Sequence, residues 1–71
     1  MTYGEKAVGL TFNPSGDEDV LMVKRLYAEI IDMLNNRRLA RGGEMARLYS
    51  IAITEAQTSQ MWAVKALTWK D

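Results

Sequence analysis

The chain has 71 residues, with nine basic and nine acidic side chains and neither cysteine nor histidine. This length fits one small domain, whose core alone rarely supplies more than about 3 to 5 kcal/mol of stability. Disulfides and thiolate or imidazole metal sites are excluded, which leaves oligomerisation as a means of burying enough surface. The balanced charge gives no broad electrostatic surface for duplex DNA or an anionic membrane.

Residues 1–16 are expected to form an arm without a helix, because they hold three of the five glycines and the only proline and show no helical period. They contain no apolar run of signal-peptide type, and no segment of the chain reaches the roughly 20 apolar residues of a membrane span. A soluble, cytoplasmic protein is therefore expected. At the end of the arm, Ser15 precedes Glu18 by three residues, a spacing that fits a helix capping box.

The first long helix is expected over residues 17–41. Acidic side chains open it and arginines close it, as the helix dipole favours. Gly42 and Gly43 then predict a short turn before a second helix over residues 44–69, so the fold class is an all-α antiparallel helical hairpin with an N-terminal arm. The apolar residues of the first helix recur at helical spacing; they are Val20, Val23, Tyr27, Ile30, Ile31 and Leu34.

The second helix carries two uncharged or apolar sides. One is rich in small residues and is expected to form the hairpin core; it comprises Met45, Tyr49, Ala52, Ile53, Ala56, Ala63, Val64 and Leu67. The opposite stripe comprises Arg47, Ile51, Thr54, Thr58, Met61, Trp62, Lys65 and Trp69. Two interpretations of this stripe remain open: a subunit interface, or a ring of Arg47 and Thr donors around a symmetry axis that suits a small phosphodiester.

Lys24 poses a second choice, because it lies at the margin of the apolar face of the first helix. A lysine in that position ordinarily extends its ammonium into water, and this interpretation is favoured. Alternatively, the ammonium meets a phosphate while Tyr3 or Phe12 stacks on a base. No nucleophile and base occur in a recognisable spacing, so no enzymatic activity, catalytic residue, cofactor or metal is expected.

Three motifs resemble the phage anti-CBASS cyclic-oligonucleotide sponge family. They are F-N-P-S at residues 12–15, V-x-x-V-K-x-x-x-A-x-x-I-D at residues 20–32, and S-I-A-x-T-x-x-Q-T-x-x-M at residues 50–61. The resemblance implies a compact homohexamer, a trimer of dimers, in the host cell cytoplasm. Such a protein sequesters cyclic dinucleotides and cyclic trinucleotides without cleaving them, and so blocks CBASS antiphage defence.

The resemblance also implies two sets of binding residues. Lys24 matches a family lysine that contacts a cyclic dinucleotide phosphate between protomers, with Asn13 and Ser15 beside it. The family's base-stacking tyrosine falls near Gly9, so the resemblance implies either that Tyr3 or Phe12 takes that role here or that the arm is rearranged. A second set, Arg47 with Ile51 and Thr54, is assigned to a cyclic trinucleotide near the three-fold axis.

Two other functions are consistent with the residues. The first is a structural or regulatory hairpin oligomer whose second stripe binds a host protein. The second is a small nucleic-acid-binding dimer that uses the cluster of Arg37, Arg38 and Arg41 and shows steep salt dependence.

Overall fold

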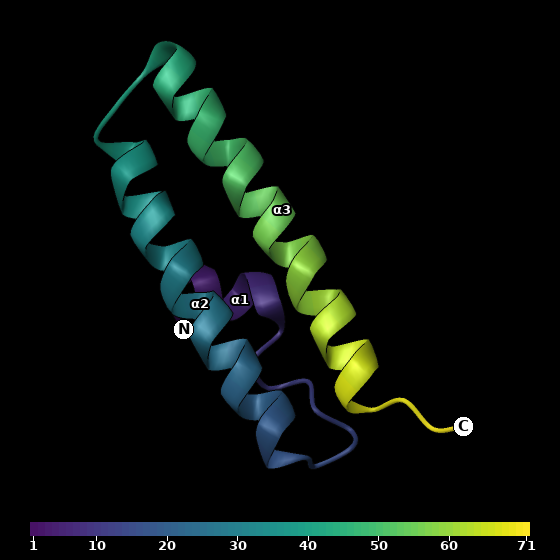
Figure 1. Ribbon diagram of the computed structural model, residues 1–71. Coiled ribbons are helices and arrows are strands. Elements are labelled where there is room, and N and C mark those ends of the chain that lie inside the picture. The colour runs from purple at the N-terminus through teal and green to yellow at the C-terminus, as the bar shows by residue number, and fades with distance from the viewer.

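The computed structural model describes residues 1–71 and contains three helices and no strand. Helix α2, Glu18–Leu39, and helix α3, Gly43–Leu67, run antiparallel as a hairpin, and the short helix α1, Tyr3–Val8, packs mainly against α2 (Figure 1). The predicted all-α antiparallel hairpin is therefore confirmed. None of the three helices combines the length and apolar character that a bilayer crossing needs.

The turns on either side of α2 depend on local side-chain and backbone geometry. Asp17 is the N-cap of α2, and its carboxylate accepts a hydrogen bond from the Asp19 N–H at 2.7 Å. The predicted capping box of Ser15 and Glu18 is wrong, because Asp17 is the N-cap and the Ser15 hydroxyl accepts from the Asp17 N–H, one residue before the Glu18 N–H that a capping box would use. At the other end, Gly43 has a φ of 60°, a conformation that favours glycine, so the predicted glycine turn is confirmed.

The expectation of an arm without a helix is wrong, because α1 forms within it. Thr2 and Glu5 make a reciprocal capping box, in which each side chain accepts from the backbone N–H of the other. This spacing of threonine and glutamate is a recognised helix-start pattern, and it was the sequence signal for α1. Gly9 ends the helix in the left-handed conformation, with a φ of 63°.

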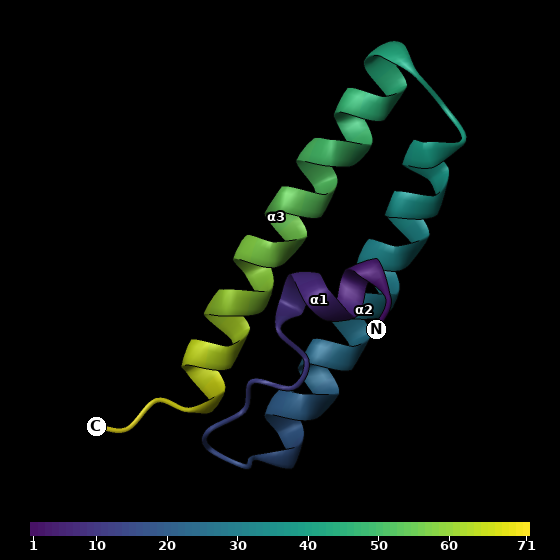
Figure 2. The same cartoon turned by 180° about the vertical axis from the view of Figure 1, so that it is seen from behind.

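Helix α1 lies across α2 (Figure 2), and the two helices come very close at Gly4. The Gly4 N–H donates to the Asp32 carboxylate at 2.6 Å, and a Cβ placed on Gly4 would stand only 2.2 Å from the Ala28 carbonyl oxygen. Because only a residue without a side chain fits at this distance, Gly4 sets how α1 sits on α2. The rest of the arm is positioned from this contact.

The core is small and lies where the three helices meet. Its buried cluster is Val8, Ala28, Ile31 and Ile53. Met45 and Leu67, which were expected in the hairpin core, are 50% and 39% exposed; they lie in the first and last turns of α3, away from the buried cluster.

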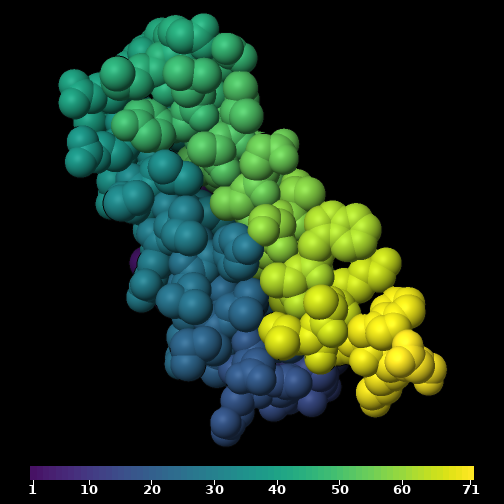
Figure 3. All heavy atoms as spheres, viewed as in Figure 1, coloured from purple at the N-terminus to yellow at the C-terminus, as the bar shows by residue number.

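Large apolar side chains also remain exposed along α2. We define the outer stripe of α2 as Met22, Leu26, Ile30 and Met33, each at least 45% exposed. Figure 3 shows one broad face on which α2 and α3 lie side by side and α1 is almost hidden. A row of exposed apolar side chains of this kind is unusual on a small monomer and is typical of an interaction surface.

Candidate functional site

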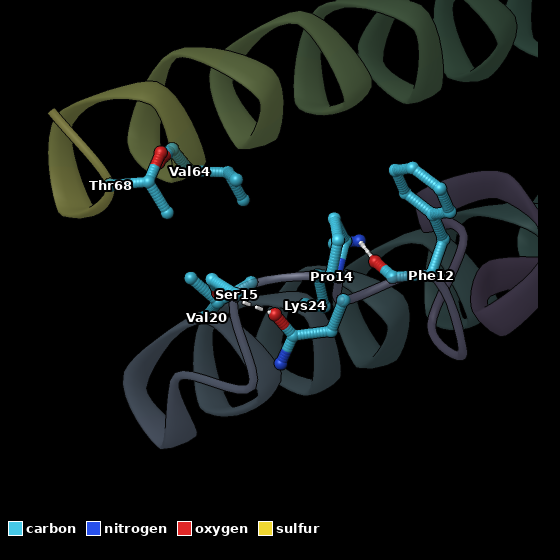
Figure 4. A pocket seen from close by; sticks show the side chains of 8 residues that line it. Phe12, Pro14, Ser15, Val20, Lys24, Val64 and Thr68 are labelled. Carbon is cyan, nitrogen blue, oxygen red and sulfur yellow. Dashed lines mark hydrogen bonds between the residues drawn. The ribbon is translucent and has the colours of Figure 1, made fainter.

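An open cleft lies between the arm, the first turns of α2 and the end of α3 (Figure 4). Its volume is about 220 Å³. Val64 of α3 and Thr68, the C-cap residue of that helix, stand opposite the arm and Val20 (Figure 4). The full lining is Phe12, Asn13, Pro14, Ser15, Val20, Lys24, Val64 and Thr68.

Lys24 is the charged residue of this cleft, and it is 5% exposed. Its ammonium donates to the Gly9 carbonyl at 3.0 Å and to the Phe12 carbonyl, and it lies 5.6 Å from the centre of the Phe12 ring. The interpretation of Lys24 as a lysine that extends into water is therefore wrong. Tertiary folding brings the arm over the side chain, and its carbonyl oxygens replace water as hydrogen-bond acceptors.

The arm turns sharply after Phe12, and two polar side chains hold that turn. The Asn13 amide donates to the Asp17 carbonyl at 3.0 Å and accepts from the Ser15 hydroxyl at 2.7 Å. Because Asn13 and Ser15 bond each other and the start of α2, they shape the cleft as well as line it. Phe12 is left 72% exposed, with its ring free to meet a planar ligand.

The structure brings together four of the five residues that the sequence assigns to a cyclic dinucleotide. Phe12, Asn13, Ser15 and Lys24 share the cleft, whereas Tyr3 lies beside Arg38, with the guanidinium carbon 5.3 Å from its ring centre. Sequence reasoning did not predict the wall made by Val64 and Thr68. No local pattern in α3 indicates it, because it depends on the antiparallel return of the chain.

Arg47, Ile51 and Thr54 share one exposed side of α3, as the helical spacing predicts. The Arg47 side chain is 62% exposed and pairs with Glu44 one turn earlier. The Thr54 hydroxyl donates to the Ser50 carbonyl of its own helix at 3.1 Å. The Arg47 guanidinium thus already has a carboxylate partner on its own helix, and the Thr54 hydroxyl proton is engaged by the backbone.

The chain matches a known domain family over most of its length. The Acb2/Tad1 hairpin domain matches residues 5–68, which is nearly the whole chain. The protein belongs to this family. It is the anti-CBASS sponge family that the motifs resemble. No curated protein and no solved structure matches the chain.

Proposed function

We propose that this protein binds and sequesters cyclic dinucleotides in the cleft around Lys24, and cyclic trinucleotides at the stripe around Arg47, without cleaving them. The observation that carries the proposal is the convergence of Lys24, Phe12, Asn13 and Ser15 on one cleft in a chain of the Acb2/Tad1 hairpin family. The biological consequence would be a block of CBASS antiphage defence in the host cytoplasm.

The chemistry at Lys24 suits a nucleotide phosphate. An ammonium has three N–H donors, and two of them are used by the carbonyls of Gly9 and Phe12. The third can donate to a phosphate oxygen without releasing the arm. Phe12 places an exposed aromatic ring next to this charge, and such a ring stacks on any nucleobase.

The size of the cleft supports a site completed by a second protomer. Pockets for small molecules usually enclose about 300 to 1,000 Å³, and this cleft is smaller and open to one side. The exposed apolar outer stripe of α2 provides a surface for assembly. We propose a homohexamer, a trimer of dimers, in which neighbouring chains close the clefts over their ligands.

The Arg47 stripe would act through symmetry. One exposed arginine binds a phosphodiester weakly, whereas copies gathered around an axis present a ring of guanidinium groups to a cyclic anion. Ile51 lies between Arg47 and Thr54 on this side and is 45% exposed, so it is available to pack against a base or a neighbouring chain.

Sequestration needs no catalytic group. A protein that is abundant and binds tightly lowers the free messenger concentration by mass action. Affinity and protein concentration therefore decide its effect, and turnover contributes nothing.

The decisive experiment combines size-exclusion chromatography with light scattering and calorimetric titration of cyclic di- and trinucleotides. We expect a multimeric mass, micromolar or tighter affinity, and intact nucleotide recovered after heat denaturation. Linear products would instead indicate an enzyme. An absence of binding to every cyclic nucleotide would overturn the proposal and favour the alternative, a structural oligomer that binds a host protein.

Lys24→Met tests the assigned phosphate contact, because methionine keeps most of the aliphatic stem and removes the charge. We expect at least about a tenfold loss of cyclic dinucleotide affinity, in line with one charge-assisted hydrogen bond. Val8→Ala serves as the matched variant, since it loosens the arm within the core while keeping the ammonium. If Lys24→Met and Val8→Ala lose the same cyclic dinucleotide affinity and show the same hydrogen exchange at the Phe12 amide, Lys24 only positions the arm.

A further inference from the structure

A second polar cluster joins all three helices toward the glycine turn. Arg38 of α2 donates to the Asn35 side-chain oxygen at 2.5 Å and to the Ser50 hydroxyl of α3 at 3.2 Å. Its guanidinium carbon lies over the ring of Tyr3 at the start of α1, 5.3 Å from the ring centre. Arg38 lies fourteen residues beyond Lys24 on the same helix, about 21 Å along its axis, so this cluster is separate from the cleft.

The cluster has a positive charge without a partner. The one ion pair in the chain joins Arg47 and Glu44, so no carboxylate lies within 4.0 Å of Arg38, although the side chain is half-buried. Neutral oxygens of Asn35 and Ser50 are its only hydrogen-bond acceptors. Partial burial of a charge is unfavourable unless an opposite charge or a full set of hydrogen bonds offsets it.

Hydrogen-bond donors are also in surplus here. A guanidinium has five N–H donors, and Arg38 uses two of them in its printed bonds. The acceptor atoms of Asn35 and Ser50 both face Arg38, so the Asn35 amide hydrogens and the Ser50 hydroxyl hydrogen point to no protein acceptor. No buried side-chain nitrogen or oxygen lacks a partner, so the Asn35 amide nitrogen and the Arg38 Nε, which make no hydrogen bond in the chain, are reachable from solvent.

We propose that Arg38, Tyr3, Asn35 and Ser50 form a second anion site, which binds a phosphate or pyrophosphate group. A forked guanidinium matches two oxygens of a phosphoryl group. Stacking on Tyr3 and the bonds to Asn35 and Ser50 hold that fork in one orientation, so little side-chain freedom is lost on binding. The exposed part of the Tyr3 ring lies beside the group and provides apolar contact.

The test is a titration of the full chain with inorganic pyrophosphate, followed by NMR at the Arg38 side-chain Nε. We expect a saturable shift of this signal, which is specific to the site and does not require cyclic nucleotide binding. Failure here and failure of the proposed function are therefore distinguishable.

Three substitutions at two neighbouring positions of α2 complete the test. Arg38→Gln should weaken pyrophosphate binding at least about tenfold, followed through the Ser50 and Tyr3 signals. Arg37→Gln removes the same charge from an exposed residue whose side chain makes no hydrogen bond or ion pair in the chain, and should change affinity less than about twofold. Arg38→Lys keeps the charge but loses the forked guanidinium, so its pyrophosphate affinity should lie between those of the other two variants.

Three results would overturn the inference. One is an unshifted Arg38 Nε signal up to millimolar pyrophosphate. Another is an equal loss for the Arg37 and Arg38 variants, which would indicate general electrostatics. The last is a fall in oligomer mass with Arg38→Gln and no pyrophosphate response in the wild type, which would mean that a carboxylate of a second copy occupies the site.

Discussion

Gly4→Ala should detach α1 from α2. The alanine Cβ would lie 2.2 Å from the Ala28 carbonyl oxygen and 2.9 Å from the Asp32 carboxylate. Ordinary contact begins at 3.4 Å, so α1 has to retreat by about 1.2 Å. A retreat of this size stretches the bond from the Gly4 N–H to Asp32 from 2.6 Å toward about 3.8 Å, which is beyond hydrogen-bond range.

The energetic consequence follows from three terms. Loss of a hydrogen bond to a charged group costs about 1.5 to 3 kcal/mol, and alanine returns up to about 1 kcal/mol through its better helix propensity. Val8, which α1 presents to the core, loses part of a burial worth about 1.5 to 3 kcal/mol when complete. We expect a net loss of about 1 to 3 kcal/mol in the free energy of unfolding, a large share for a domain of this size.

Urea denaturation at fixed protein concentration measures this change, and hydrogen exchange of the α1 amides locates it. Gly42→Ser is the matched control, because a side chain at this position meets nothing within 4 Å. Glycine and serine are both acceptable N-cap residues, and exchanging them changes stability by only a few tenths of a kcal/mol. The close-contact argument is refuted if the free energy of unfolding of Gly4→Ala lies within about 0.5 kcal/mol of the wild-type value and the α1 amides stay protected from hydrogen exchange.

Three further predictions concern binding and assembly. Phe12→Ala should weaken cyclic dinucleotide binding by about 1 to 3 kcal/mol in a calorimetric titration without lowering the thermal midpoint; unchanged affinity would exclude base stacking at Phe12. Replacing both Leu26 and Ile30 by lysine should reduce the mass measured by light scattering, whereas Glu29→Lys, an exposed change on the same turn, should not; equal masses would place the interface elsewhere. Arg47→Ala should abolish cyclic trinucleotide binding and preserve cyclic dinucleotide binding, because its exposed ion pair contributes at most about 1 kcal/mol to stability; parallel loss of both ligands would contradict separate sites.

Much of the hairpin was predictable from local patterns. The helical period of the apolar residues and the glycine pair at 42–43 gave both long helices to within two residues at each end. The short α1 was missed because its glycine-rich composition outweighed the capping box of Thr2 and Glu5. Of the site residues, Phe12, Asn13, Ser15 and Lys24 were assigned to one pocket through the family resemblance, and they do share the cleft.

The sequence by itself determined where the two long helices begin and end to within two residues, because turns and periodicity act over a few residues. It also determined that one side of α3 stays exposed in a single chain, since the hairpin has no further helix to cover it. Only the tertiary structure decided the surroundings of Lys24 and Tyr3. The close fit at Gly4 seats α1 on α2, which brings the Gly9 and Phe12 carbonyls over Lys24 and the Tyr3 ring under Arg38. Contacts of this kind join residues that are distant in the chain, and no local pattern encodes them.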